Sequence, residues 1–367
     1  MIPRTRPHFD IQKAQYHIAY PIQTESNDAD GIFLNSGQAC LYTFLSVFGP
    51  NKRVGIQVFT CPTVLEAIIL SGDIPVYMDI DAEYFSTRLA VINSIIDNID
   101  ILVLTHLFGI PNPDYIHISS LCKQKNVILI DDLCQTYKAK VEGKFIEELS
   151  DNYYYSFFYD KPLPCASGGM LKVSKNLKDC VEKKISELPK EAERKGRSKL
   201  NKLVNMYFLL SSDIYKHDFR TNSILENWLL AHYPIEWNSK WLYKLLSSPI
   251  NRGSAKLLPR YNYSSHKMKM SDIQVSFIKS LFDSYQNRTY ILIDYYNKNG
   301  YTLPSYLTNP KIESSSSQRA IVKKQHVCLD NAEVGLYNWP KLLDDRASYP
   351  NAEYVIKNYV NIPIVEF

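Results

Sequence analysis

The sequence lacks a long apolar run and carries little net charge. No window reaches the roughly 18 apolar residues needed to span a membrane, and the opening MIPRTRPHFD has no signal-peptide core. The net charge is +4 over 367 residues, with no basic tail or stripe. We therefore expect a cytoplasmic protein that binds neither membrane nor nucleic acid.

Paired cysteines are also missing. The seven cysteines are odd in number and none belongs to a CxxC pair, so they indicate neither a disulfide framework nor a zinc site. We expect small, buried or half-buried thiols and no metal. A hydrophobic fraction of 45% and a charged fraction of 22% are ordinary for a globular protein. The length allows a large core and more than one domain.

Short apolar runs alternate with amphipathic segments between residues 30 and 175. Strands are predicted at 55–59, 74–79, 99–106, 127–131, 153–158 and 170–173. Helices are predicted between them at 38–47, 64–71, 90–97 and 114–125. This alternation, with several continuous Val/Ile/Leu strands, predicts an α/β domain with a buried, mostly parallel sheet between helices. Ligands bind such sheets at the carboxyl ends of the strands.

The remaining sequence predicts a helical stretch and a small C-terminal α+β domain. Within the helical stretch, the charged run 190–199 is either an anion patch or a solvated helix face interrupted at a glycine; its composition favours the solvated face. Ser271 is a plausible N-cap for a later helix. Short strands are predicted near 326–329 and 361–365. The expected domains are 1–258, an N-terminal arm and large domain with a helical insertion at about 176–258, and 259–367.

Three short pieces fall at predicted strand or helix ends. In Asn35–Leu41 a Ser-Gly turn opens into a helix, where backbone N–H groups can bind phosphate. Asp131 and Asp132 end a buried strand, and such a carboxylate needs a partner: a basic side chain, helix N–H groups or a cationic ligand atom. Lys161 follows a strand that ends near Ser156. It is either a loop lysine packed on aromatics or a desolvated amine that has lost its preference for charge and attacks carbonyl groups.

Together these pieces are the parts needed to hold pyridoxal phosphate (PLP). The lysine forms a Schiff base with the cofactor, and the carboxylate keeps the pyridine nitrogen protonated so that the ring acts as an electron sink. The turn and a hydroxyl hold the phosphate. The order of the three pieces on one α/β domain therefore favours the reacting amine over the loop lysine.

The motifs resemble those of the sugar-nucleotide aminotransferases, the DegT/DnrJ/StrS family, which has the aspartate aminotransferase fold. SFxxxKxLxxxxGG, from Ser156 to Gly169, is similar to the family's lysine motif, and IDDxxQ (Ile130–Gln135) is similar to its (I/L)EDxxQ. Four further segments match in the same order: FTCPT (59–63), GDIPVYMDID (72–81), HLFG (106–109) and KMSDIQ (269–274). The resemblance covers about residues 30–175 and 262–290.

The resemblance implies an aminotransferase that moves an amino group from glutamate to a keto group of a nucleotide-linked deoxysugar. The context would be surface-polysaccharide or glycoside biosynthesis. Lys161 would form the Schiff base and move protons, and His106 would have a supporting role. The implied cofactor contacts are Gly37, Gln38, Ala39 and Ser156 with the phosphate, Asp132 with the pyridinium nitrogen, Gln135 with the 3′-oxygen and Cys61 with the ring. A homodimer with shared active sites is also implied.

The sequence departs from the family's pattern near the phosphate. Gln38 replaces a usual Thr, Ser167 replaces a Glu, and the run 267–270 (Lys-Met-Lys-Met) replaces Asn-Tyr-Arg-Met. We expect Lys267 to take the place of that Asn at the partner's phosphate, with Asn262 as a less well aligned substitute.

Two alternatives remain open. One is a catalytically silent regulatory or scaffold protein with this fold, which the altered phosphate turn leaves possible. The other is a PLP- or PMP-dependent sugar dehydratase (PMP, pyridoxamine phosphate). Lys161 argues against the dehydratase, because such relatives carry His at that position.

Overall fold

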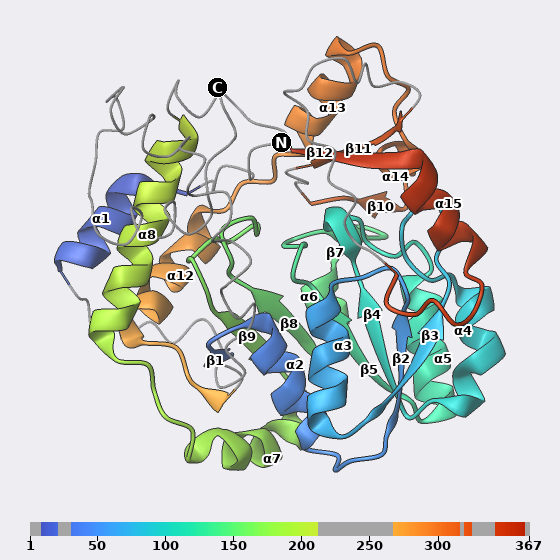
Figure 1. Cartoon of the computed structure of the whole chain (residues 1–367), viewed down its shortest axis with the longest axis horizontal. Coiled ribbons are helices and arrows are strands. Elements are labelled where there is room, and N and C mark those ends of the chain that lie inside the picture. The colour runs from blue at the N-terminus through green and yellow to red at the C-terminus, as the bar shows by residue number, and fades with distance from the viewer. Residues whose placement is uncertain (1–8, 21–30, 212–266, 316–318, 325–341, 364–367) are drawn as a thin grey trace, which may run out of the picture.

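The computed structural model describes residues 9–20, 31–211, 267–315, 319–324 and 342–363, and a seven-stranded sheet forms its centre (Figure 1). The strands follow one another across the sheet as β1 (Ile32–Leu34), β9 (Gly169–Lys172), β8 (Tyr153–Ser156), β5 (Ile128–Asp132), β4 (Ile101–Thr105), β2 (Arg53–Gln57) and β3 (Ile74–Met78). From β8 to β3 all neighbours are parallel, whereas β9 pairs antiparallel with β8 and β1. The expected α/β fold with a mostly parallel, mixed sheet is confirmed.

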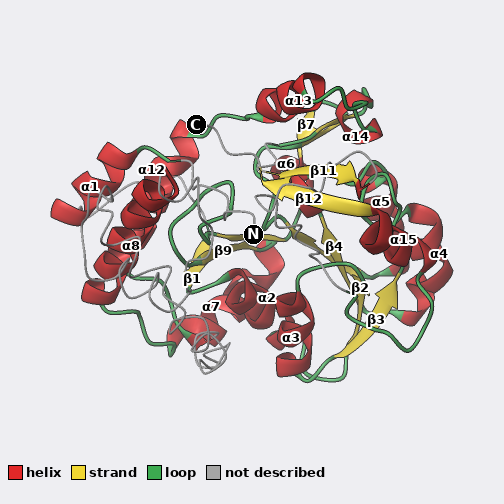
Figure 2. Ribbon diagram, turned by 45° about the horizontal axis from the view of Figure 1, so that its top comes forward, coloured by secondary structure: helices red, strands yellow, loops and turns green. Residues whose placement is uncertain are grey.

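Helices cover both faces of this sheet (Figure 2). One face carries α2 (Gly37–Ser46), α3 (Pro62–Ser71) and α7 (Lys175–Ser186), and the other carries α4 (Leu89–Ile95) and α5 (Tyr115–Lys125). Burial on both faces explains why the sequence of strand β4 is continuously apolar. Ile101 and Val103 belong to the core under α2 and α3, and Leu102 and Leu104 belong to the core under α4 and α5. Successive side chains of a strand point to opposite faces, so a sheet covered twice needs apolar residues throughout.

The predicted elements of this domain are all present. Each of the six strands and four helices predicted between residues 38 and 173 is found, with ends displaced by at most two residues. The first strand, β1, was not predicted. It has only three residues and is defined by its pairing with β9, which no local pattern reveals.

The other elements lie at the edges of the large sheet. Helices α1 (Ile11–Ala19), α8 (Glu193–Ser211) and α12 (Asp272–Ser284) pack side by side (Figures 1 and 2). In the described ranges, the further α-helices are α6 (Ile146–Leu149), α13 (Thr289–Lys298), α14 (Ser305–Thr308) and α15 (Pro350–Asn358), and two short 3-10 helices lie at Ile96–Asn98 and Leu107–Gly109. The remaining strands are β6 (Lys140–Val141), β7 (Lys144–Phe145), β10 (Ile312–Glu313), β11 (Arg319–Lys323) and β12 (Tyr359–Pro363), with β10 paired to β6 and β11 to β12. No helix in the described ranges is long and apolar enough to cross a membrane.

Two C-terminal expectations have different outcomes. The strand predicted at 361–365 is confirmed for its first half, which belongs to β12. The strand predicted at 326–329 and the later part of the helical stretch, 212–258, lie outside the described residues.

Most residues of the charged run 190–199 are exposed, as the expected solvated face requires, but the expected interruption at a glycine is wrong. Helix α8 passes through Gly196 without a break, and a Cβ on Gly196 would overlap the hydroxyl of Ser271 at the start of α12. Lys190 pairs with Asp272 at 2.6 Å. The glycine is there because the two helices approach closely, and not because the helix ends.

Ser271 is the N-cap residue of α12, as predicted, but its side chain does not cap the helix. Its hydroxyl instead donates to Gln274 Oε1 at 3.0 Å. The free N–H groups of Asp272 and Ile273 donate to the two carboxylate oxygens of Glu193, at 2.7 and 3.0 Å. A residue of α8 therefore supplies the cap, which a local sequence pattern does not reveal.

Candidate active site

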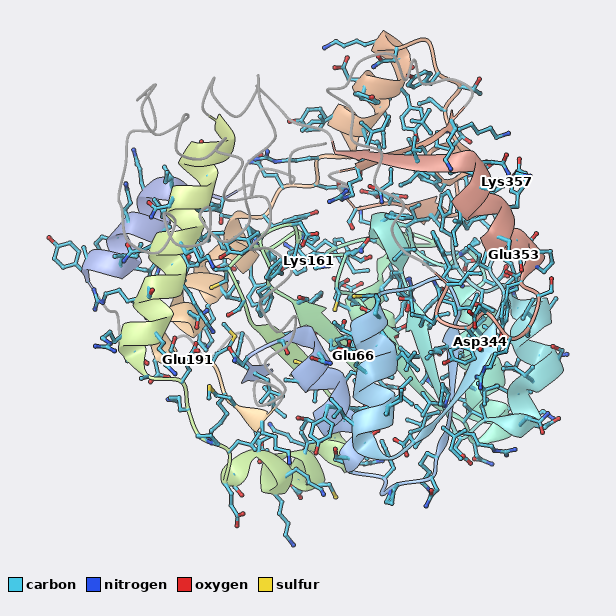
Figure 3. All side chains as sticks on the ribbon, in the orientation of Figure 1. Glu66, Lys161, Glu191, Asp344, Glu353 and Lys357 are labelled. Atoms are coloured by element: carbon cyan, nitrogen blue, oxygen red, sulfur yellow. The ribbon has the colours of Figure 1, made fainter. Side chains whose placement is uncertain are left out.

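The lysine loop, residues 157–168, joins β8 to β9. Ser156, the last residue of β8, pairs with Gly169, the first residue of β9, so the loop begins and ends at one edge of the sheet. That edge is the carboxyl end of β8 and of its parallel neighbour β5. The Lys161 side chain is 13% exposed and lies near the centre of the molecule (Figure 3). The loop therefore places an amine where ligands bind sheets of this kind.

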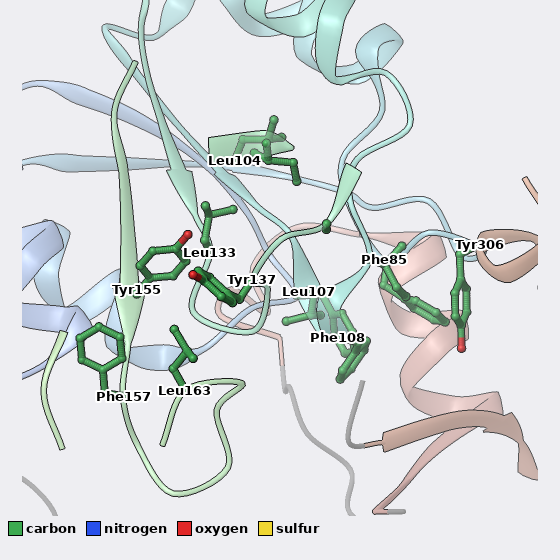
Figure 4. Packing of buried hydrophobic residues seen from close by; sticks show 14 of the residues in the cluster. Phe85, Leu104, Leu107, Phe108, Leu133, Tyr137, Tyr155, Phe157, Leu163 and Tyr306 are labelled. Carbon is green, nitrogen blue, oxygen red and sulfur yellow. The ribbon is translucent and has the colours of Figure 1, made fainter. Parts of the chain in front are cut away.

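Apolar contacts fix the two arms of the lysine loop. Phe157 and Leu163 are buried in the same core as Tyr155 (Figure 4). At the other end, Gly168 has φ +118° and packs against Met270, whose sulfur would lie 2.6 Å from a Cβ at that position. Only glycine satisfies both the backbone angle and the close approach.

Gln274 of α12 holds the loop from the other side. Its side chain is fully buried, and Nε2 lies 3.4 Å from the carbonyl oxygens of Cys165 and Ser167. The amide oxygen is oriented by its bond from Ser271. The lysine motif and the distant KMSDIQ segment are thus parts of one structural unit.

Two adjacent carboxylates end β5, and both are buried, with Asp131 0% and Asp132 4% exposed. Their side chains point to opposite sides of the strand. Asp131 accepts hydrogen bonds from Tyr115 Oη at 3.0 Å and Ser150 Oγ at 2.5 Å, and it lies 3.0 Å from His106 Nε2. Protein side chains therefore satisfy Asp131.

His106 belongs to the surroundings of Asp131. Its Nδ1 accepts from the backbone N–H of Asn112 at 3.2 Å, so Nε2 carries the proton and donates to Asp131. The histidine is fully buried and connects the turn after β4 to the end of β5. Its supporting role in the reaction stays a prediction.

Asp132 lacks a comparable set of partners. Cys134 N donates to Oδ1 at 3.0 Å and Thr105 Oγ1 donates to Oδ2 at 3.4 Å. Among the described residues, no cation lies within ion-pair distance of its oxygens. A buried carboxylate without a charged partner is costly. Its surroundings fit a cationic ligand atom, and a pyridinium nitrogen is such an atom.

The protein groups around Lys161 favour its charged form. Burial lowers the pKa of the amine, but the Asp160 carboxylate at 4.0 Å raises it, and Cys134, Cys61 and Asp132 act in the same direction. The net pKa of Lys161 lies above its ordinary value. Desolvation was expected to remove the amine's preference for the charged form. In the protein without cofactor this expectation is wrong, because the acidic groups raise the pKa of Lys161 by more than burial lowers it.

The Ser-Gly turn opens α2 beside the end of β8. Ser36 is the N-cap, and its Oγ accepts from Ala39 N at 3.0 Å. A Cβ on Gly37 would lie 3.1 Å from the Cβ of Ser156, and a Cβ on Gly169 would lie 2.7 Å from Gly37 N. Glycines at 37 and 169 thus let the helix start, the Ser156 side chain and the lysine loop meet. A helix N-terminus in such a place suits an anion.

Two of the expected phosphate contacts are already engaged. The Ala39 N–H donates to Ser36, and the Gln38 side chain donates to Glu66 Oε2 on α3 at 2.8 Å. Burial raises the pKa of Glu66, and the bond from Gln38 opposes that rise. The backbone N–H groups of Gly37 and Gln38, with the Ser156 hydroxyl, remain as donors for a phosphate.

Gln135 is oriented by the turn after β4. Its Oε1 accepts from Phe108 N at 2.7 Å. Phe108 and Gly109 both have left-handed angles, φ +59° and +77°, and Gly109 O accepts from the buried Ser315 N at 2.9 Å. The bond leaves Gln135 Nε2 as a donor for an acceptor oxygen, as the expected contact with the cofactor's 3′-oxygen requires.

Lys267 is the site residue that the structure does not bring to the others. It is exposed and forms no ion pair with a described residue. The segment that follows it does lie beside the phosphate turn, because Asn35 N donates to Met268 O at 3.0 Å. Asn262 lies outside the described residues.

Several residues of the site were not singled out from the sequence. Ser36 and Asp160 are adjacent to motif residues, so their positions could have suggested them. Thr105 and Cys134 contact Asp132 through strand pairing and a turn, which the sequence does not reveal. Cys61, by contrast, was expected from the sequence beside the cofactor ring; it is the half-buried N-cap of α3 and is close enough to Lys161 to affect its pKa. In the described part of the chain, no cluster of three or more His, Cys, Asp or Glu side chains could hold a metal.

Comparison with known proteins shows first a shared fold and then a region similar to one family. The fold matches that of the PMP-form of Spr1654 from Streptococcus pneumoniae with a TM-score of 0.63, over 99% of this chain and 92% of the other, at 17% identity. Residues 25–199 match the model of the DegT/DnrJ/EryC1/StrS aminotransferase family. The matched part of the chain, a little under half of its length, holds Lys161, Asp132 and the Ser-Gly turn, so this region is similar to that family.

Curated relatives match over a similar part of the chain. UDP-N-acetyl-3-dehydro-alpha-D-glucosamine 3-aminotransferase of Acidithiobacillus ferrooxidans is 28% identical over 166 residues, 44% of each chain. A pleiotropic regulatory protein of Geobacillus stearothermophilus is 29% identical over 154 residues, 41% of each chain. The chain thus spans less than half the length of these relatives in the matched region.

Proposed function

We propose that this protein is a PLP-dependent aminotransferase that moves an amino group, with glutamate as the donor, to a keto group of a nucleotide-linked deoxysugar. The observation that carries the proposal is Asp132, a buried carboxylate that lacks a cationic partner among the described residues. It lies close enough to Lys161 to raise the pKa of that amine. The family match and the aminotransferase relative support the reaction class and the sugar-nucleotide substrate.

The residues present fit the cofactor. Bound PLP supplies an electron sink for the carbon that loses or gains the amino group. Asp132 would hold a proton on the pyridine nitrogen, and Gln135 Nε2 would donate to the 3′-oxygen. The phosphate would receive bonds from the backbone N–H groups of Gly37 and Gln38 and from the Ser156 hydroxyl.

Lys161 would attach the cofactor and then move protons at the reacting carbons. Its loop is anchored by Gln274 and by the core on both sides. A rigid support is what an amine needs to reach the same atom in each turnover. Cys61 would lie against the cofactor ring.

The place and assembly of the enzyme are part of the proposal. We place it in the cytoplasm, in surface-polysaccharide or glycoside biosynthesis, as a homodimer with shared sites. Lys267 is exposed, unpaired among the described residues, and precedes the segment beside the phosphate turn, which supports a contact with the partner subunit's cofactor.

A second candidate is a regulatory protein that keeps this fold without turnover. Gln38 favours it, because its side chain is bonded to Glu66 in place of a phosphate contact, and one relative is a pleiotropic regulatory protein. A sugar dehydratase is disfavoured by Lys161.

The visible spectrum of the purified chain separates these functions. After incubation with PLP, the aminotransferase should show the absorbance of a lysine-bound cofactor, and glutamate should convert it to that of PMP. Cofactor uptake without conversion by any amino acid would favour the regulatory protein. A chain that cannot be loaded with PLP would contradict the proposal.

A further inference from the structure

Asp160, the residue before Lys161, has an unusual environment for a carboxylate. Its side chain is 35% exposed as a whole, yet its Oδ1 atom is buried and has no hydrogen-bond partner among the described residues. A buried acceptor left without a donor is costly. Such an atom in a native structure calls for an explanation.

The Lys161 amine is a hydrogen-bond donor that lies close to this oxygen. Asp160 Oδ1 lies 4.0 Å from Lys161 Nζ, just beyond hydrogen-bond distance. The backbone between them is fixed, because Lys161 N donates to Phe158 O at 3.2 Å. A small rotation of either side chain would therefore close the pair without moving the loop.

The other acidic groups near the amine are different in kind. Asp132 already accepts two hydrogen bonds, and burial raises the pKa of the Cys134 thiol well above its ordinary value. Cys61 shares a contact with Thr63 at 3.1 Å. Of these acidic groups, Asp160 is the one with a buried oxygen, Oδ1, that accepts no hydrogen bond from a described residue.

We propose that Asp160 is a positioning residue for the reaction, whose carboxylate holds the free amine of Lys161 as an ammonium ion. The inference rests on the proposed function, in which Lys161 is the reacting group. Asp160 would fix the amine's position whenever it is free. It would also set the pH above which the amine becomes nucleophilic, since an ammonium ion has no lone pair for attack.

The test measures Lys161 itself, without PLP. The rate at which a small amine-reactive reagent labels Lys161 is followed by peptide mass spectrometry as a function of pH, in the wild-type chain and in Asp160→Asn. We expect the pH at which labelling of Lys161 is half-maximal to be lower in Asp160→Asn than in the wild type. At neutral pH the variant should be labelled faster, by about tenfold for each pH unit by which this midpoint falls. Asp294→Asn is the matched control, because it removes the same charge from an exposed pair on α13.

Asp160→Glu separates charge from shape. It keeps the carboxylate and should restore most of the wild-type midpoint, and circular dichroism establishes that each variant is folded. An unchanged midpoint in Asp160→Asn, or an equal shift in the Asp294 control, would overturn the role of Asp160. A wild-type chain that takes up no PLP would contradict the proposed function instead, so the two failures can be told apart.

Discussion

Asp131 and Asp132 are consecutive residues of one strand, and their carboxylates have opposite surroundings. Asp131 is satisfied by His106, Tyr115 and Ser150. Among the described residues, Asp132 accepts from a backbone amide and a more distant hydroxyl, with the neutral side chains of Tyr154 and Cys134 close by and no cation within ion-pair distance. The first has the environment of a structural residue. The second has the environment of a ligand-binding residue, because its charge is left without a partner in the described part of the chain.

Substitutions at the two positions should therefore have opposite effects. Asp131→Ala leaves the buried side chains of His106 and Tyr115 without their partner, so the free energy of unfolding should fall by about 2 kcal/mol or more, at about 1–3 kcal/mol for each group. Asp132→Asn removes an unpaired buried charge, so the melting temperature of the PLP-free chain should stay the same or rise. Thermal unfolding of both variants without PLP makes the comparison.

Asp132→Asn should also weaken PLP binding. A hydrogen bond to a charged group contributes about 1.5–3 kcal/mol, so the dissociation constant should rise roughly 10- to 150-fold. Fluorescence titration with PLP measures it. Equal affinities for PLP in wild type and variant would show that Asp132 does not bind the cofactor.

Gly169→Ala should damage the phosphate turn. The new Cβ would lie 2.7 Å from Gly37 N and from Ser36 carbonyl atoms, all of them backbone. We expect a loss of about 1–3 kcal/mol in stability and weaker binding of PLP, because the start of α2 must move. Gly55→Ala is the control: its Cβ would meet side-chain atoms and no backbone, with the end of the Ile99 side chain at 2.9 Å and that of Leu102 at 3.4 Å. Similar losses in both variants would contradict this account of the turn.

Gln274→Ala should loosen the lysine loop. It leaves the buried Ser271 hydroxyl and the loop carbonyls without their partner, at a cost of about 1–3 kcal/mol. Because Lys161 is then held less firmly, kcat should fall more than KM rises. Gln124→Ala, on the exposed face of α5, should change stability by less than about 0.5 kcal/mol. Steady-state kinetics and urea unfolding of both variants test the claim.

Cys165 should make stability depend on alkaline pH. Burial raises the pKa of its thiol to about 12. The folded chain thus keeps a proton that the unfolded chain loses above about pH 8.5. By linkage, stability is unaffected below that pH and falls from there towards about pH 12, by up to about 1.4 kcal/mol per pH unit. Urea unfolding at several pH values should give a smaller pH slope for Cys165→Ala; an equal slope would contradict the assignment.

The fold could be predicted well because its signals are local. The continuous apolar run of β4 and the amphipathic helices between strands determine the domain. The site was predicted in part for the same reason: Lys161, Asp132 and Gly37 lie in short motifs at strand or helix ends. Their convergence depends on parallel pairing, which brings the carboxyl ends of β5 and β8 together.

What could not be predicted depends on contacts between distant segments. Glu193 caps a helix 79 residues further along the chain. Gly196 allows the close approach of α8 and α12 and does not end a helix. Burial alone predicts a lowered pKa for Lys161, whereas its pKa in the folded chain is raised. The carboxylate of Asp160 beside the amine reverses the sign, and its effect requires the geometry of the loop.

The most direct test of the account is the visible spectrum of the PLP-loaded chain, compared between wild type and Lys161→Ala. The account predicts that the wild-type chain shows the absorbance of a lysine-bound cofactor and that glutamate converts it to PMP. The folded Lys161→Ala chain should show neither the lysine-bound band nor the conversion at a comparable rate. The same band and the same conversion in Lys161→Ala would contradict the account.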